Sequence, residues 1–185
     1  MSVDAVLSTK KGDADDDLAI RCREGETRAF NEIVTRYQTR LFLFCYRLLA
    51  ERSEAEDAVQ ETFIRTYRAL PAYRPDGYFS SWIYRIALNE CRRRLRSRKV
   101  TVPLDLVDGV SNTPDPQNAM LTSERNRLVR AAVNGLPEHY RVVMMLFYFE
   151  EMSVDQISKT INVSVSAVKV RLHRGRERLS TRISL

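Results

Sequence analysis

Apolar residues recur every three or four positions through most of the first half of the chain, from about Leu18 to Lys99. This interval matches the 3.6 residues per turn of an α-helix, so it predicts helices rather than strands. In one long segment the spacing lays a wide apolar stripe along a single side: Phe30, Ile33, Val34, Tyr37, Leu41, Phe44, Cys45 and Leu48. A stripe of this width must be covered by other helices, which favours an antiparallel bundle.

The segment from Ser53 to Leu70 predicts a second helix of that bundle. Ser53 and Glu56 have the spacing of a capping box, which would begin the helix. Apolar residues continue from there at helical spacing: Ala58, Val59, Phe63, Ile64 and Tyr67. Pro71 cannot continue a helix, so the segment is expected to stop before it.

A third helix is expected to restart near Ser80 or Ser81 and to run to about Arg98, and it has two distinct faces. Its core face carries apolar residues at intervals of four, three and four: Tyr84, Leu88, Cys91 and Leu95. The opposite stripe repeats the same intervals with basic residues and one amide: Arg85, Asn89, Arg92 and Arg96, joined by Arg93. Guanidinium groups in a row suit a phosphate backbone, and an amide can hydrogen-bond a base edge. The stripe therefore predicts contact with DNA.

Aromatic residues cluster just before and at the start of that helix: Tyr73, Tyr78, Phe79 and Trp82. Such rings can stack on unpaired bases, although core packing is the better expectation for each ring taken singly. For Trp82 the two readings are evenly balanced. Pro75 and Gly77 are expected to hold the residues from Tyr73 to Tyr78 in a surface loop.

Helical periodicity disappears between Val100 and Gln117, where prolines, a glycine and small polar residues interrupt it. We therefore predict an all-α fold of two small helical domains joined by a flexible linker. The expected parts are an acidic N-terminal tail over 1–17, a helical bundle over 18–99, the linker over 100–119 and a second helical domain over 120–185.

The second domain is expected to contain a helix-turn-helix after two helical patterns, Leu121 to Val133 and Glu138 to Phe149. Ser153 and Gln156 form a capping box for its first helix, Asn162 suits the turn, and Ser164 can cap its second helix. Five apolar residues are expected to fill the angle between the two helices: Ile157, Ile161, Val163, Val168 and Leu172.

Placing Val168 and Leu172 inward turns a mixed polar and basic face outward on the second helix of this motif. The outward positions are Ser166, Lys169, Val170, His173 and Arg174, with Arg171 and Arg176 on the flanks. Lysine and arginine on such a face can reach base edges in a major groove, while Arg176, Arg178 and Arg182 would meet phosphates. The alternative is a solvated basic helix end, which would leave the capped first helix and the short turn unexplained.

Charge supports a polyanionic partner. The 185 residues carry a formal net charge of +6, and five aspartates against two lysines in the first 17 residues leave +9 for residues 18–185. A basic body of this kind suits nucleic acid or an acidic membrane surface. The longest apolar run, Val142 to Phe149, has eight residues against the roughly 20 needed to cross a bilayer, so no membrane insertion is expected.

The three cysteines, Cys22, Cys45 and Cys91, lie far apart among apolar neighbours and come without a signal peptide. Buried thiols in a reducing cytosol are the expected reading, which makes the protein cytoplasmic. Only two histidines are present, and neither has ligand spacing to a cysteine, so we expect no metal and no cofactor.

Taken together, these residues resemble the extracytoplasmic-function sigma factors, the smallest branch of the bacterial sigma-70 family, over nearly the whole chain. The segments similar to region two of that family are Arg28-Ala29-Phe30 with Tyr37, then Ala55 to Arg65, then Phe79 to Asn89. The segments similar to region four are Leu136-Pro137, Tyr140-Arg141 and the helix-turn-helix ending at Arg176. The resemblance implies a non-catalytic subunit that binds core RNA polymerase and directs it to selected promoters.

The resemblance also implies three sets of contacts. Docking on the largest polymerase subunit falls to Asp57, Gln60, Glu61 and Phe63, and the helix Val142 to Phe149 would help to dock on the second-largest subunit. Capture of an unpaired base in the minus-ten element falls to the loop Tyr73, Arg74, Asp76, Tyr78 and Phe79, together with Trp82, Arg85, Asn89, Arg92, Arg93 and Arg96. Duplex reading of the minus-thirty-five element falls to Ser164, Ser166, Ala167, Lys169, Val170, Arg171, His173, Arg174 and Arg176.

Members of this family are commonly held inactive by an anti-sigma factor, and we expect such a partner here. The chain departs from many relatives at Ser166-Ala167, where they have Gly-Thr, and at Gly175, where they have Ala. Ala167 lacks a hydroxyl that could reach a phosphate, and Gly175 is expected to loosen the helix by about 1 kcal/mol relative to alanine.

Two other functions compete with the sigma factor. A free-standing helix-turn-helix repressor would need only one DNA-facing helix and would leave Asp57 to Phe63 and the Asn89 stripe unexplained. An enzyme acting on nucleic acid is weaker still, because its carboxylates would have to gather in a pocket, whereas Asp13 to Asp17 are expected in a mobile N-terminus.

Overall fold

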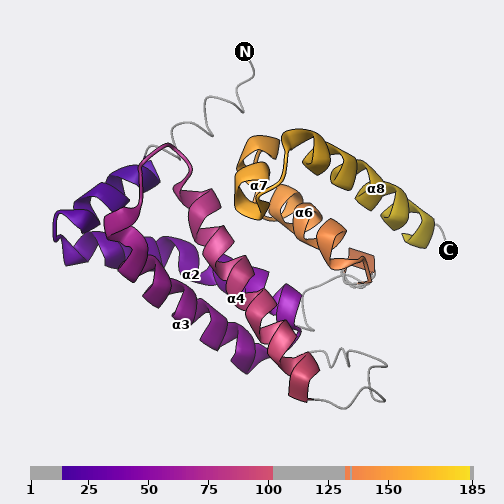
Figure 1. The fold of residues 1–185 in the computed structure, drawn as a ribbon, viewed down its shortest axis with the longest axis horizontal. Coiled ribbons are helices and arrows are strands. Elements are labelled where there is room, and N and C mark those ends of the chain that lie inside the picture. The colour runs from indigo at the N-terminus through magenta and orange to yellow at the C-terminus, as the bar shows by residue number, and fades with distance from the viewer. Residues whose placement is uncertain (1–13, 102–131, 134, 184–185) are drawn as a thin grey trace, which may run out of the picture. The chain divides into compact units, whose positions relative to one another are not determined.

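The structure is a computed structural model that describes residues 14–101, 132–133 and 135–183, without the side chains of residues 99–101 and 182–183. Every regular element in these ranges is a helix, which confirms the all-α class (Figure 1). The chain divides into two compact units, Met1–Val102 and Pro103–Leu185. Residues 100 and 101 of the predicted linker are helical, and its remainder, 102–119, lies outside the described residues. Nearly all of the predicted helix from Leu121 to Val133 and the side chain of Arg182 also lie outside them.

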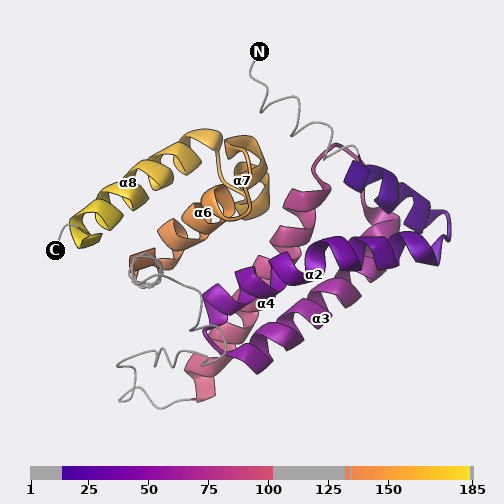
Figure 2. The ribbon, with the colours of Figure 1, turned by 180° about the vertical axis from the view of Figure 1, so that it is seen from behind.

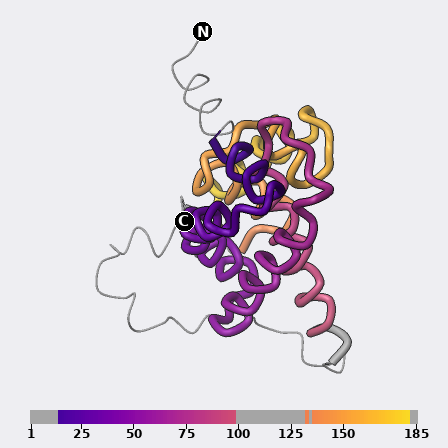
Figure 3. Tube along the Cα trace, turned by 90° about the vertical axis from the view of Figure 1, so that its left-hand side faces the viewer, coloured from indigo at the N-terminus to yellow at the C-terminus, as the bar shows by residue number. Residues whose placement is uncertain are grey.

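Three long helices form the first unit: α2 (Thr27–Leu49), α3 (Arg52–Ala69) and α4 (Phe79–Thr101). They lie alongside one another, as Figure 2 shows, and each packs against the other two. The 3₁₀ turn η1 (Leu70–Ala72) follows α3 and places Pro71 within it, so the α-helix stops where the proline predicts. Residues 14–23 form a further helical segment beside the loop that joins η1 to α4 (Figure 3).

Aromatic rings from α2 and α4 form the centre of this unit. Tyr37 makes edge-to-face contacts with Phe79, at 5.8 Å between ring centroids, and with Tyr84, at 6.4 Å. Phe44 contacts Tyr84 in the same way at 5.2 Å. All four side chains are at most 1% exposed, so the predicted stripe on α2 is the side that meets α4.

Two buried thiols lie in the same core. Cys45 on α2 and Cys91 on α4 are each 0% exposed, as the sequence predicts for structural cysteines, and Cys22 is half-buried. A hydrogen bond to Cys91, followed by burial, raises the pKa of the Cys45 thiol far above its usual range. The thiol therefore stays protonated and packs as a small apolar group.

The predicted capping box at the start of α3 is wrong. Glu51 is the N-cap residue, and its carboxylate accepts hydrogen bonds from the backbone N–H groups of Ser53, at 2.9 Å, and Glu54. Ser53 is itself inside the helix and donates its hydroxyl to the same carboxylate. The backbone bond from Glu54 is the main cause of a lowered Glu51 pKa, which keeps the cap ionised at the positive end of the helix.

The expectation of a mobile acidic N-terminus is wrong for residues 14–17. These residues are helical, and the side chains of Asp15 and Asp16 are buried, at 1% and 7% exposure. Their burial is possible because each carboxylate accepts hydrogen bonds from side chains or backbone of the bundle. Residues 1–13 lie outside the described residues.

Helices α6 (Glu138–Tyr148), α7 (Val154–Ile161) and α8 (Val165–Ile183) form the second unit, and they confirm the predicted helix-turn-helix. The capping box of Ser153 and Gln156 is present in both directions. Asn162 takes the left-handed conformation at φ 54° that ends α7, and the Ser164 hydroxyl caps α8 by accepting from the Ala167 N–H at 3.2 Å.

Gly175 is buried where α8 packs against α6. A Cβ atom there would come 3.0 Å from the Met144 sulfur and 3.1 Å from its Cγ, tighter than ordinary contact. An alanine at this position would require the Met144 side chain to shift by a few tenths of an ångström, whereas glycine accepts it in place. Within the described residues no helix is both long and apolar enough to cross a bilayer.

Candidate functional site

Two apolar anchors set the exposed side of α8. Val168 and Leu172 are 0% and 4% exposed, so the opposite side of the helix faces solvent. The residues on that side are all exposed, as their spacing predicts: Ser166, Lys169, Val170, His173 and Arg174. The basic side chains of this face can pair with phosphates or guanine edges. The exposed Val170 side chain beside them can contact a thymine methyl group.

The flanks of this face are less available than the sequence predicts. Ser164 is occupied as the α8 cap, and Ala167 and Arg171 are half-buried. Arg176 turns to α6: its Nε donates to the Tyr148 hydroxyl at 2.8 Å, and its guanidinium lies 5.5 Å from the centre of the Phe147 ring. The geometry therefore gives Arg176 a role in fixing α8 on α6, which the basic pattern alone did not reveal.

The basic stripe on α4 is only partly as predicted. Asn89 and Arg96 are exposed on one side of the helix, with Arg85 and Arg92 half-buried beside them. Arg93 departs from this row, because its guanidinium forms a two-pronged pair with Glu90 at 2.9 and 2.6 Å. The row that can meet a phosphate backbone is therefore centred on Asn89 rather than on an unbroken run of arginines.

The aromatic cluster divides into two layers. Tyr73 is only 7% exposed, so the expectation that the loop holds it at the surface is wrong, and Phe79 is fully buried. Trp82 packs over both rings, at 4.6 Å from Tyr73 and 5.6 Å from Phe79, and remains half-buried. The two inner rings thus support the indole, and only Trp82 and the half-buried Tyr78 have surface to offer a base. Arg74 and Asp76 are exposed at the tip of the loop.

The predicted polymerase contacts lie on the outer side of α3. Asp57 and Gln60 are exposed, while Glu61 and Phe63 are half-buried. Two large apolar residues that the helical spacing grouped with the other apolar positions of this helix are exposed, Ile64 at 44% and Tyr67 at 55%, and the sequence analysis did not place them among the polymerase contacts. Both continue the helical spacing at the edge of the buried side of α3. The Tyr67 ring contacts Phe30 of α2 at 5.0 Å between ring centroids, yet much of each side chain faces solvent.

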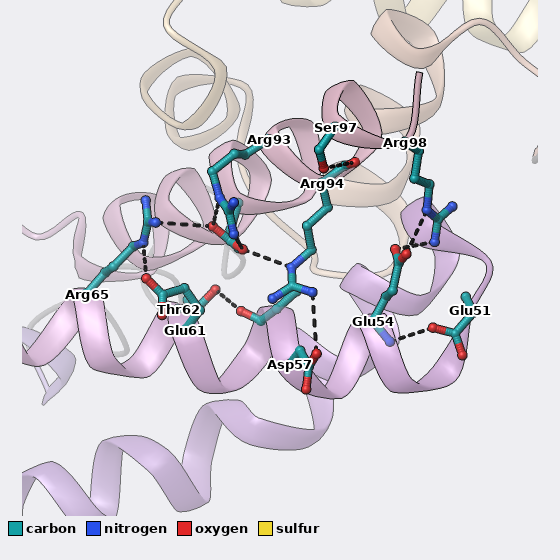
Figure 4. Close-up of polar contacts among 12 residues, drawn as sticks. Glu51, Glu54, Asp57, Glu61, Thr62, Arg65, Arg93, Arg94, Ser97 and Arg98 are labelled. Atoms are coloured by element: carbon teal, nitrogen blue, oxygen red, sulfur yellow. Dashed lines mark hydrogen bonds and ion pairs between the residues drawn. The ribbon is translucent and has the colours of Figure 1, made fainter. Parts of the chain in front are cut away.

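Ion pairs fix α3 against α4 (Figure 4). Glu90 on α4 is buried and accepts from Arg93 and from Arg94 at 2.8 Å, with Arg65 of α3 at 3.5 Å. Arg94 reaches Asp57 at 3.6 Å, and Arg98 forms a two-pronged pair with Glu54. The hydrogen bond from Arg93 is the main cause of a lowered Glu90 pKa, so the carboxylate is charged in the folded protein.

Replacing Glu90 with glutamine is expected to lower the free energy of unfolding by about 1–3 kcal/mol, because several guanidinium groups lose their buried acceptor. Because the pKa of Glu90 is lower in the folded protein than in the unfolded one, its charge stabilises the fold fully at pH values above the ordinary glutamate pKa of about 4.3. This stabilisation is lost as the pH falls through the pKa of Glu90 in the folded protein. The difference in free energy of unfolding between the unchanged protein and Glu90→Gln, measured by urea unfolding, should therefore be largest at neutral pH and decrease in acid.

The control for Glu90 is the Glu56→Gln variant. Glu56 pairs with Arg52 at 2.9 Å, but both side chains are more than half exposed, so the loss should be below about 1 kcal/mol. Equal losses for the two variants, or a Glu90→Gln effect independent of pH, would contradict the stabilising role of the Glu90 cluster.

Comparison with known families identifies both units. The family model described as sigma-70 region 2 matches residues 33–101, and the model described as sigma-70, region 4 matches residues 126–179. Among curated proteins, the ECF RNA polymerase sigma factor SigW of Bacillus subtilis is 35% identical over 85% of this chain and 90% of its own length. The RNA polymerase sigma-H factor of Pseudomonas aeruginosa is 32% identical over 88% of this chain and 90% of its own length.

Solved structures show the same fold. CnrH, solved in complex with the cytosolic domain of CnrY, aligns with a TM-score of 0.72 at 26% identity, covering 93% of this chain and 98% of CnrH. The sigma factor RpoE of Bartonella quintana, solved with the anti-sigma factor NepR, aligns with a TM-score of 0.75 at 22% identity over 86% and 99%.

Proposed function

The chain belongs to the sigma-70 family, as a sigma factor of the extracytoplasmic-function type, and we propose that two of the surfaces described above bind promoter DNA and the third binds polymerase. As a sigma factor it binds core RNA polymerase and directs initiation at selected promoters, and it is not an enzyme. Our proposal concerns which residues do this.

The outward face of α8 reads the duplex minus-thirty-five element. The observation that carries this assignment is the exposure of all five outward residues, Ser166, Lys169, Val170, His173 and Arg174, opposite two buried anchors. A helix presented in this way after a capped first helix can enter a major groove with its cations toward base edges and phosphates.

The Asn89 side of α4 and the loop 73–78 bind the separated non-template strand at the minus-ten element. Asn89 is exposed about two helical turns beyond Trp82 and on the same side of α4, so one base could stack on the ring while an amide reads its edge. Extruding a base costs a few kcal/mol of lost stacking, which such contacts offset.

The outer side of α3 docks on the largest polymerase subunit. Asp57, Gln60 and Glu61 supply charge and hydrogen bonds, and the exposed Ile64 and Tyr67 supply apolar area beside them. The mixture resembles a protein interface, where apolar residues are surrounded by polar ones. The end of α6, with Tyr148 at 50% exposure, is the corresponding candidate for the second-largest subunit.

An anti-sigma factor is the regulator that fits this family, and we assign the protein to the cytoplasm, where polymerase and promoter DNA meet. Support comes from CnrH, whose structure holds the cytosolic domain of CnrY. An inhibitor that covers the outer side of α3 would exclude polymerase from the exposed Asp57 and Gln60.

Transcription in vitro tests the function directly. The chain is added to sigma-free bacterial core polymerase with a pool of genomic fragments, and the starts are mapped. Starts that share two upstream elements at constant spacing support the assignment. Palindromic duplex binding in the absence of polymerase, without discrete starts, would instead favour the repressor.

Replacing Asn89 with alanine is expected to reduce open complexes about tenfold at those promoters, because a hydrogen bond to an unpaired base is lost. Polymerase binding should not change, since α3 is untouched. Permanganate footprinting measures open complexes, and competition for core measures binding. The Ser97→Ala variant on the same helix is the control, and equal loss of both activities with Asn89→Ala would contradict the assignment.

A further inference from the structure

The helical segment 14–23 holds both ends of the loop that joins η1 to α4. One carboxylate oxygen of Asp16 accepts from the Tyr73 hydroxyl at 2.6 Å, and the other accepts from the backbone N–H of Gly77. Arg23 donates to the Tyr73 carbonyl at 3.2 Å. One buried aspartate therefore bridges the first and fifth residues of the loop 73–77.

The segment is itself firmly attached to the bundle. Asp15 accepts from the Tyr37 hydroxyl at 2.5 Å and from Arg36. Leu18 and Ala19 are 2% and 0% exposed, so the segment also buries apolar side chains. Asp16 thus projects from a fixed support, and the position of the loop follows from the position of the carboxylate.

The Asp16 carboxylate has a hydrogen-bond donor on each side, the Tyr73 hydroxyl and the Gly77 N–H. Gly77 has φ of +79°, a conformation in which its N–H points back toward Asp16, and glycine adopts it without strain. The Tyr73 hydroxyl is buried under Trp82 and also needs a partner. Without the carboxylate, the Tyr73 hydroxyl and the half-buried Gly77 N–H would both lose their acceptor, and leaving such donors without one costs more than the bonds themselves contribute.

We infer that Asp16 is a positioning residue for strand separation: by tying Tyr73 to Gly77 it fixes the loop tip and the Trp82 ring in the geometry that receives the unpaired strand. This inference rests on the proposed role of the loop and Asn89. The tip residues Arg74, Pro75 and Asp76 are exposed, and the Asp16 bonds lie at both of its ends. Asp16 touches no DNA and acts through the loop.

Two readouts test Asp16→Ala in the full-length chain. Hydrogen exchange of the Gly77 amide should accelerate about tenfold or more, since its bond to Asp16 is gone. Open complexes with core polymerase, at promoters mapped with the unchanged protein, should fall about tenfold, while competition for core stays the same. Compared with Asp16→Ala, Asp16→Asn should recover most of the slow Gly77 exchange and most of the open complexes. Its amide oxygen can accept from the Gly77 N–H, and its NH₂ can donate to the Tyr73 oxygen.

The control and a milder variant keep the result interpretable. Asp17 is exposed and, within the part of the chain that the structure describes, pairs with Arg21 at 3.8 Å, so Asp17→Ala should change neither readout. Should Asp16→Ala fail to fold, Tyr73→Phe removes one of the two bonds and should give smaller changes of the same kind. Unchanged exchange at Gly77, or faster exchange with normal open complexes, overturns the inference. Failure of the unchanged protein to form open complexes would instead count against the proposed function.

Discussion

Replacing Arg174 with alanine is expected to weaken binding to a duplex upstream element by about 5- to 150-fold, the equivalent of about 1–3 kcal/mol. Arg174 lies on the outward side of α8, one turn beyond Val170, and the buried Leu172 fixes that orientation. An arginine in a major groove can donate two parallel hydrogen bonds to one guanine. Fluorescence anisotropy with a labelled duplex from a mapped promoter measures the change.

Two further variants separate base reading from charge at Arg174. Arg174→Lys keeps the charge but loses the planar fork, so it should recover little affinity if a guanine is read and most of it if a phosphate is bound. Arg178→Ala removes the same charge from the same helix, but its guanidinium lies 5.1 Å from the Tyr140 ring on α6, so the loss should be smaller and equal for all sequences. Recovery by lysine, with no change in sequence preference, would contradict base reading.

The parts of the fold that depend on local sequence were predictable. The helix-turn-helix is specified by neighbours in the chain: Ser153 with Gln156, Asn162 at the turn and Ser164 as the cap. Its exposed face follows from the inward positions of Val168 and Leu172, since helical spacing fixes the remainder. The stripe on α2 was likewise readable, because its width left only one side that could be buried.

The parts that depend on distant pairing were not predictable. Asp16 meets Tyr73 across 57 positions of sequence, so neither the burial of the acid nor that of the ring has a local signal. The contact of Arg176 was equally unpredictable, because its partner Tyr148 is 28 residues away in the sequence and lies on another helix. A basic pattern in the sequence shows which residues carry positive charge, but only the fold shows which of these side chains are already bound to other residues of the protein.

The start of α3 shows that local signals can also compete. Ser53 and Glu56 have capping-box spacing, yet Glu51 caps the helix two residues earlier. Its longer side chain reaches both the Ser53 and Glu54 N–H groups, and it takes the Ser53 hydroxyl as well. Glu56 is left to pair with Arg52 on the helix surface. Helix α3 therefore begins earlier than the capping-box spacing predicts, because Glu51, although not a usual capping residue, accepts hydrogen bonds from more donors at the helix start.

Replacing Asp57 with lysine is expected to weaken binding to core polymerase by at least tenfold and to abolish transcription at limiting concentrations of the chain. The Asp57 carboxylate is 64% exposed and pairs with Arg94 only at 3.6 Å, so it is available to a basic partner surface. Reversing its sign places like charges together, and such juxtaposition costs up to several kcal/mol at an interface. Competition against a labelled sigma factor for core polymerase measures the loss.

Glu56→Lys provides a matched control for Asp57, since it makes the same charge change one residue earlier. Glu56 is exposed and pairs with Arg52, and its side chain points about 100° away around the helix. Arg94 keeps its bond to Glu90 in the Asp57 variant, so urea unfolding should show little loss of stability for either protein. Equal loss of polymerase binding by both variants would mean that net charge, rather than the Asp57 side of α3, decides the docking.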